Sequence, residues 1–125
     1  MSNAVFVKNG IEGVNYTPAA AVSAGDVIVQ SSLVGVAKTN IAIAEVGSLA
    51  IAGVFDIPQK AEIIAAGKPV YWDADGDPYN GTAGTGAMTA TVADGVFAGF
   101  ALQLTTATTT NVRVALQSAP VDAIA

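Results

Sequence analysis

The chain has 125 residues, of which 52% are hydrophobic and only 12% charged, and its formal net charge is −5. The few basic residues are dispersed and form no patch that could neutralise phosphates, which argues against a nucleic-acid partner. The sequence contains neither cysteine nor histidine, so thiolate chemistry and the usual general base are missing, and we expect no enzymatic activity, no catalytic residue and no cofactor or metal site.

Short β-branched runs, broken by Gly, Asp, Asn or Pro every eight to twelve residues or so, predict an all-β sandwich or barrel. A turn signal at Asn9-Gly10 ends the first run, and Ser31-Ser32 joins the third and fourth runs as a hairpin. The first four predicted strands are Ala4–Lys8, Gly13–Thr17, Val27–Gln30 and Leu33–Lys38.

The longest run, Val46–Ile57, predicts one long strand. Its two faces are both apolar, which is typical of a central strand that is covered on each side. Of the remaining segments only Gln59–Ala66 could be helical, with Gly67 as its C-terminal cap, and Ile63-Ile64 could equally be a short strand. We therefore expect at most one short helix.

Four further strands are predicted in the second half, and two of them alternate clearly. In Val96–Leu104 the residues Val96, Ala98, Phe100, Leu102 and Leu104 fall on one face. In Val112–Gln117 the residues Val112, Val114 and Leu116 point inward, and Arg113 and Gln117 point outward. The four predicted strands are Pro69–Asp73, Ala87–Val92, Val96–Leu104 and Val112–Gln117.

The length predicts a single domain over residues 1–125. No stretch approaches the ~20 apolar residues of a membrane span, and residues 1–5 lack the basic-then-apolar pattern of a signal peptide. We expect a soluble protein that is made in the cytoplasm without export and has no membrane partner. The low charge indicates a surface covered by a partner or by a second copy, and so a homo-oligomer, either a dimer or a trimer.

Asp73, Asp75 and Asp77 stand at alternate positions, as at the start of a calcium-binding loop. However, Pro78 occupies the place of the required glycine, and Gly84 stands where the final glutamate is needed. Asp-Gly and Asp-Pro are also ordinary turn residues, so a turn is the favoured interpretation and a cation site the alternative.

Tyr71 and Trp72, together with Tyr79, could form an aromatic platform for a ligand. The simpler interpretation is that Trp72 anchors a core that has few other large side chains.

The order of several segments resembles a family of small phage and prophage proteins associated with capsid decoration or cementing. The Val70-Tyr71-Trp72-Asp73 segment is the most persuasive of them. The others are Phe6–Gly10, Val22–Val29, Leu33–Ala37, Gly53–Pro58, Ala66–Asp73, Gly99–Ala101 and Val112–Val114.

This resemblance implies a jelly-roll-like β-sandwich that binds the outer face of an assembled tailed-phage head. The implied partner is the major capsid protein, the implied location is the exterior of the virion, and the family offers no catalytic residue. Two alternatives stay open: another virion component, such as a head-fibre base or an adhesin domain, and a carbohydrate- or cation-binding module.

The N-terminal residues are the candidate contact arm. Residues 1–8 contain a predicted strand whose edge could add to the sheet of a capsid partner or of a second subunit. The candidate contact residues are Ala4, Val5, Phe6, Val7 and Lys8.

Overall fold

The computed structural model describes residues 13–117, which form nine strands and one 3₁₀ turn. The all-β prediction is confirmed. In chain order the elements are β1 (Gly13–Tyr16), β2 (Val27–Gln30), β3 (Leu33–Ala37), β4 (Gly47–Ala50), β5 (Gly53–Pro58), β6 (Pro69–Asp73), β7 (Ala87–Thr89), the 3₁₀ turn η1 (Val92–Asp94), β8 (Val96–Ala101) and β9 (Asn111–Leu116).

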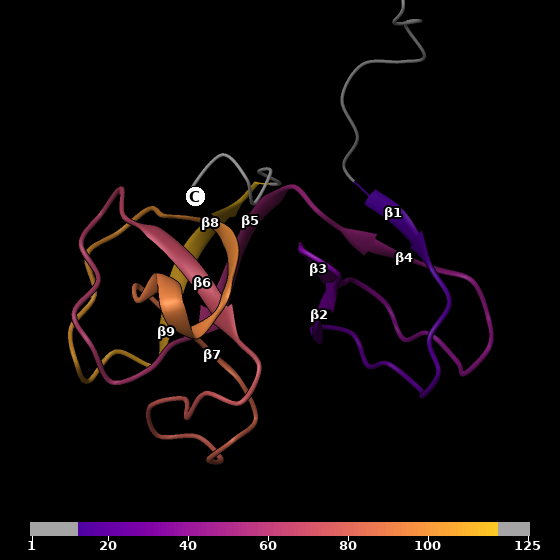
Figure 1. Cartoon of the computed structure of the whole chain (residues 1–125), viewed down its shortest axis with the longest axis horizontal. Coiled ribbons are helices and arrows are strands. Elements are labelled where there is room, and N and C mark those ends of the chain that lie inside the picture. Colours follow the sequence, from indigo (N-terminus) through magenta and orange to yellow (C-terminus); the bar gives the residue numbers. More distant parts are fainter. Residues whose placement is uncertain (1–12, 118–125) are drawn as a thin grey trace, which may run out of the picture.

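The strands form two antiparallel sheets in a sandwich-like arrangement (Figure 1). The N-terminal sheet has the order β1-β4-β3-β2, and the C-terminal sheet has the order β5-β9-β8-β6-β7. Each sheet is therefore built from one continuous part of the chain. The segment between β4 and β5 carries the chain from the first sheet to the second.

The C-terminal sheet curls until its two edge strands meet. Gln59, directly after β5, forms a parallel bridge with Met88 of β7, and the Lys60 N–H donates to the Met88 carbonyl at 3.0 Å. Because β5 and β7 are the two edges of this sheet, the bridge brings it close to a barrel. Curling of this kind protects edge groups that would otherwise stay unpaired.

The main core lies inside the curled sheet and extends to the N-terminal sheet. Val34 and Val36 of β3 pack into it, whereas Ala37 packs with Leu49 on the opposite face of the N-terminal sheet. The N-terminal sheet is therefore apolar on both faces. The second-sheet members of the core are Ile57, Ile64, Val70, Trp72, Met88, Ala98, Ala101, Val112, Val114 and Leu116.

The predicted hairpin is confirmed, since Gln30 pairs with Leu33 across a two-residue turn. Ser31 adopts a φ of 59° in that turn, a conformation that two-residue hairpin turns require. The inward alternation of Val112, Val114 and Leu116 in β9 is confirmed as well.

The prediction of a single strand over Val46–Ile57 is wrong. Gly53 has a φ of +120°, and the chain turns there, so β4 and β5 belong to different sheets. Moreover, β5 is an edge strand of its sheet. Val54 is exposed because alternation along the strand turns it away from the core, against which its neighbour Phe55 packs. The two apolar faces of the run arise from two separate strands with different surroundings.

No helix forms at Gln59–Ala66, where a helix was the alternative to a short strand. The buried Gln59 side chain instead donates to the carbonyls of Lys60, Glu62 and Thr106. The carboxylate of Glu62 accepts from the backbone of Ala90. The bonds to Thr106 and from Ala90 reach remote parts of the chain, and they hold the segment in an irregular, non-helical path. Within residues 13–117, no helix is long and apolar enough to cross a membrane.

The predicted single face of Val96–Leu104 is wrong, because β8 ends at Ala101 and contains an irregularity. Val70 of β6 pairs with Gly99 of β8, but the next residue, Tyr71, pairs with Phe97. Ala98 is therefore left without a partner on β6. Such a bulge moves the following side chains to the other face. Phe100 accordingly lies edge-on to Phe97, with ring centroids 5.5 Å apart, and Leu102 and Leu104 are exposed.

β7 ends at Thr89, three residues before the predicted strand end, and η1 follows at Val92. The remaining predicted strand, Ala4–Lys8, lies outside the described residues.

Candidate functional site: a groove between the two sheets

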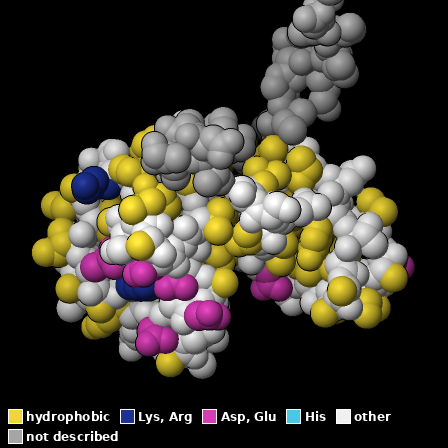
Figure 2. Space-filling view, viewed as in Figure 1, with side chains coloured by type: hydrophobic (Ala, Val, Ile, Leu, Met, Phe, Trp, Pro, Cys, Tyr) yellow, Lys and Arg dark blue, Asp and Glu magenta, His cyan; other side chains and the backbone are white. Residues whose placement is uncertain are grey.

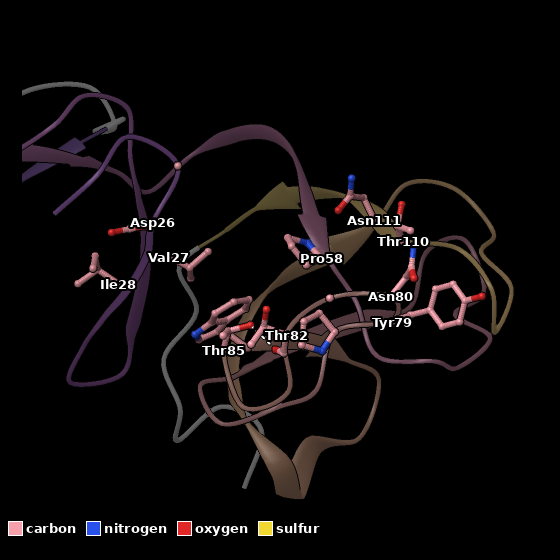
Figure 3. Close-up of a pocket in the computed structure, with 15 residues that line it drawn as sticks. Asp26, Val27, Ile28, Pro58, Tyr79, Asn80, Thr82, Thr85, Thr110 and Asn111 are labelled. Atoms are coloured by element: carbon pink, nitrogen blue, oxygen red, sulfur yellow. Dashed lines mark hydrogen bonds between the residues drawn. The ribbon is translucent and has the colours of Figure 1, made fainter.

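A groove of about 570 Å³, partly open to solvent, lies between β2 and the loop 78–86 (Figure 3). Val27 and Ile28 of β2 form one wall. Uncharged polar side chains of the loop, among them Asn80 and Thr82, form the other. The edge of Trp72 contributes an aromatic surface between the two walls.

The loop wall is held in place by hydrogen bonds of its own. Asp77 Oδ1 accepts from the Gly84 N–H at 2.7 Å, and Thr85 Oγ1 donates to the Thr82 carbonyl at 2.7 Å. The Tyr79 N–H donates to the Gln59 carbonyl at 2.8 Å, which ties the loop to the end of β5. Contacts within the protein therefore hold the loop wall, and a wall fixed in this way lowers the entropy cost of binding.

Trp72 acts as the core anchor that the sequence favoured. Its side chain belongs to the main core and is only 8% exposed. Tyr71, the preceding residue of the same strand, faces the other side, where its ring lies 6.0 Å from that of Phe97 at 67°. Neighbouring strand residues point in opposite directions, so Tyr71 and Trp72 do not form one platform with Tyr79.

In the segment 73–77 the carboxylates of Asp73 and Asp77 have separate partners, and Asp75 contributes its backbone N–H. Asp73 Oδ2 lies 2.8 Å from Lys60 Nζ, and its Oδ1 accepts from the Asp75 N–H at 3.1 Å. The hydrogen bond from Lys60 holds the pKa of Asp73 below its usual value and raises that of Lys60. Asp77 binds the loop, as described above. Within residues 13–117 no group of three or more His, Cys, Asp or Glu side chains is arranged to hold a metal ion.

A second ion pair lies on the outside of the C-terminal sheet. The Arg113 guanidinium of β9 donates to both carboxylate oxygens of Asp56 in β5, at 2.9 and 3.0 Å. This two-point contact lowers the pKa of Asp56. Both side chains are about half exposed, so the pair contributes little to stability.

Large apolar side chains are exposed in several places. Figure 2 shows apolar side chains over both sheets, and the charged ones gather mainly on the part formed by the C-terminal sheet. The exposed large apolar residues among those described are Ile43, Val46, Val54, Ile63, Val92, Leu102 and Leu104.

The candidate contact residues Ala4–Lys8 lie outside the described part of the chain, which begins with β1 at Gly13. The groove was missed by sequence reasoning. Its walls come from β2 and from a loop about fifty residues later in the chain, and neither segment contains a recognisable binding motif.

Searches of curated proteins and of solved structures find no match to this chain. A comparison with protein-family models does find one. A family model described as phage cement protein matches residues 7–116, which is most of the chain. The match covers both sheets and the groove. The chain therefore belongs to the phage cement protein family.

Proposed function

We propose that this protein binds the major capsid protein on the outer surface of an assembled tailed-phage head and stabilises the shell. The match to the phage cement family over residues 7–116 carries this proposal, since that family has a capsid decoration role. The role needs contact area and shape complementarity rather than reactive groups. We infer that the protein is made in the cytoplasm of the bacterial host and ends on the capsid exterior.

The described surface supports such a role. Exposed apolar residues such as Val54 and Leu104 stand on a chain with few charges. The centres of protein interfaces are depleted in charged residues in the same way. Many copies on one shell would multiply modest individual contacts through avidity.

We further propose that the chain is a single domain, that it acts as a dimer or trimer, and that Ala4–Lys8 contact the capsid or a neighbouring subunit. The low charge of the sequence supports the oligomer. The apolar and β-branched character of residues 4–8 supports the contact segment.

Quantitative mass spectrometry of purified virions tests the role directly. The copy number of this chain is measured against that of the major capsid protein. We expect hundreds of copies in a simple ratio to the capsid subunit. A handful of copies would instead indicate a fibre base or adhesin at one vertex, and complete absence from the virion would favour a carbohydrate- or cation-binding module.

Stabilisation is tested by comparing virions with and without this protein. Heads that lack it should release their DNA at a lower temperature, and adding back the purified chain should restore the original value. Deletion of residues 1–8 should lower the occupancy of the capsid. Unchanged occupancy after that deletion would contradict the contact role of the segment.

A further inference from the structure

The edge of β2 offers unpaired backbone groups. β2 pairs only with β3 in its sheet. The Ala37 N–H donates to the Asp26 carbonyl at 2.9 Å, and Gln30 faces Leu33 across the hairpin turn. Because hydrogen-bonded pairs alternate along an antiparallel ladder, Val27 and Val29 direct their N–H and C=O groups away from β3. Among the described residues β2 has no other strand partner, and the backbone hydrogen bonds formed outside the strands include none to Val27 or Val29.

The groove runs along this same edge and has a charge preference. Asp26 lies in its wall and forms no ion pair with any described residue. No Lys or Arg side chain lines the groove. An extended segment that carries one cation would therefore meet free backbone partners along β2 and a carboxylate at one end.

We propose that residues 4–8 of a second copy add to β2 as an antiparallel strand. The proposal rests on the homo-oligomer proposed above and names the two segments that form it. Val5 and Val7 would lie on one face of such a strand, and Phe6 and Lys8 on the other. The segment has the apolar character and the single terminal cation that the edge requires.

The alternation of β2 defines the register. Val27 and Val29 pack toward the main core, and Ile28 packs toward the core on the opposite face of the N-terminal sheet. Matching apolar faces places Val7 opposite Val27 and Phe6 opposite Ile28. This register brings the Lys8 ammonium beside the Asp26 carboxylate, and it makes Val5 and Val7 the hydrogen-bonded positions.

We assign residues 4–8 to a second copy because the linker between Lys8 and Gly13 of the same chain is too short to reach the edge of β2. β1 and β2 are the two edges of the N-terminal sheet, so a strand added beside β2 lies four strand spacings, ~19 Å, from Gly13. The five residues from Lys8 to Gly13 span at most ~18 Å when fully extended, and they would also have to pass around the sheet.

In each copy the donor segment precedes β1 in the chain, and β1 and the acceptor β2 are the two edges of the N-terminal sheet. Exchange of this kind closes either as a reciprocal dimer or as a ring. Both arrangements fit the expected dimer or trimer.

Cysteine cross-linking tests the register, since the natural chain has no cysteine. The variants Phe6→Cys and Ile28→Cys are prepared separately and then mixed under mild oxidation. Opposed residues at a non-hydrogen-bonded position have Cα atoms ~4.5 Å apart, within the range of a disulfide. We expect a disulfide-linked heterodimer from this mixture, and at least tenfold less from Val5→Cys mixed with Ile28→Cys, because Val5 faces the other side.

A backbone variant tests whether strand addition holds the oligomer together. Val7→Pro removes an N–H that the register directs toward β2, whereas Ala4→Pro removes one that points away from it. The mass of each full-length variant is measured by light scattering. Val7→Pro should lower the mass to that of the monomer, and Ala4→Pro should leave the oligomer intact.

The outcomes separate this inference from the proposed function. An oligomer that survives Val7→Pro, or equal cross-linking of the Val5 and Phe6 variants, overturns strand exchange and leaves capsid decoration standing. An intramolecular disulfide in the double variant Phe6→Cys/Ile28→Cys overturns the second copy as donor. A monomeric natural protein overturns both the exchange and the homo-oligomer, while decoration is judged independently by the count of copies in virions.

Discussion

The Gln59 side-chain amide donates to the Thr106 carbonyl at 3.1 Å, across 47 positions of the chain. The same Nε2 donates to the carbonyls of Lys60 and Glu62, and the side chain is fully buried. This one amide therefore ties together the end of β5, the irregular segment after it and the threonine-rich loop before β9.

Replacing this amide should be strongly destabilising. Gln59→Leu keeps a similar volume but removes all three hydrogen bonds. The Glu62 carbonyl then has no other donor among the described residues, whereas the Lys60 and Thr106 carbonyls keep the N–H groups of Glu62 and Thr109. We expect the free energy of unfolding to fall by about 1–3 kcal/mol, measured by urea titration. The matched control is Gln103→Leu, an exposed glutamine, which should change stability by less than about 0.5 kcal/mol. Equal effects of the two substitutions would contradict the role of Gln59.

We expect the Glu62 side chain to stabilise the chain at the end of β7. Its carboxylate accepts from the Ala90 N–H at 2.7 Å and from Thr89 Oγ1 at 3.0 Å. Glu62→Ala removes both charge-assisted hydrogen bonds, and we expect a loss of about 1–3 kcal/mol. Thermal unfolding measures the loss. The exposed Glu45 supplies the control, since Glu45→Ala should leave the midpoint nearly unchanged.

Two glycines of the loop 78–86 should respond differently to alanine. Gly84 and Gly86 both have positive φ, at +79° and +108°. A Cβ on Gly84 would meet nothing within 4 Å, whereas one on Gly86 would approach Trp72 Cη2 to 2.7 Å. Gly84→Ala should cost only the backbone strain of about 1 kcal/mol, and Gly86→Ala should cost about 3 kcal/mol or more because Trp72 must also move. Indistinguishable midpoints in chemical denaturation would refute this close packing.

The Lys60–Asp73 ion pair should make a pH-dependent contribution. The pKa of Asp73 is lowered from 3.8 and that of Lys60 is raised from 10.5. The contribution of Asp73 is present above pH 3.8 and is lost as the pH falls through its lowered pKa. The contribution of Lys60 is present below pH 10.5 and is lost as the pH rises through its raised pKa.

Lys60→Met keeps the apolar stem and removes the charge. We expect this substitution to lower the free energy of unfolding by about 0.5 kcal/mol at neutral pH. The loss should become progressively smaller as the solution is acidified below pH 3.8. Lys38→Met, at an exposed lysine without an ion pair to any described residue, is the control. A difference between wild type and Lys60→Met that stays constant on acidification would argue against the pair.

Local sequence patterns predicted much of this fold. Two-residue alternation identified β9 with its inward Val112 and Val114, and the serine pair between two β-branched runs identified the β2–β3 hairpin. The order of turn-into-strand segments also carried the resemblance to the family. These features depend only on neighbours in the chain, which is why they could be read without a structure.

The tertiary structure decided the rest. It divided Val46–Ile57 between two sheets at Gly53. It also kept Gln59–Ala66 from forming a helix, because the side chains of Gln59 and Glu62 bind backbone groups of remote segments. It also turned Phe100 away from the core through a bulge, and it brought the free edge of β2 beside the loop 78–86 to form the groove. Each of these outcomes depends on contacts between residues that are distant in sequence, and a local pattern carries no information about such contacts.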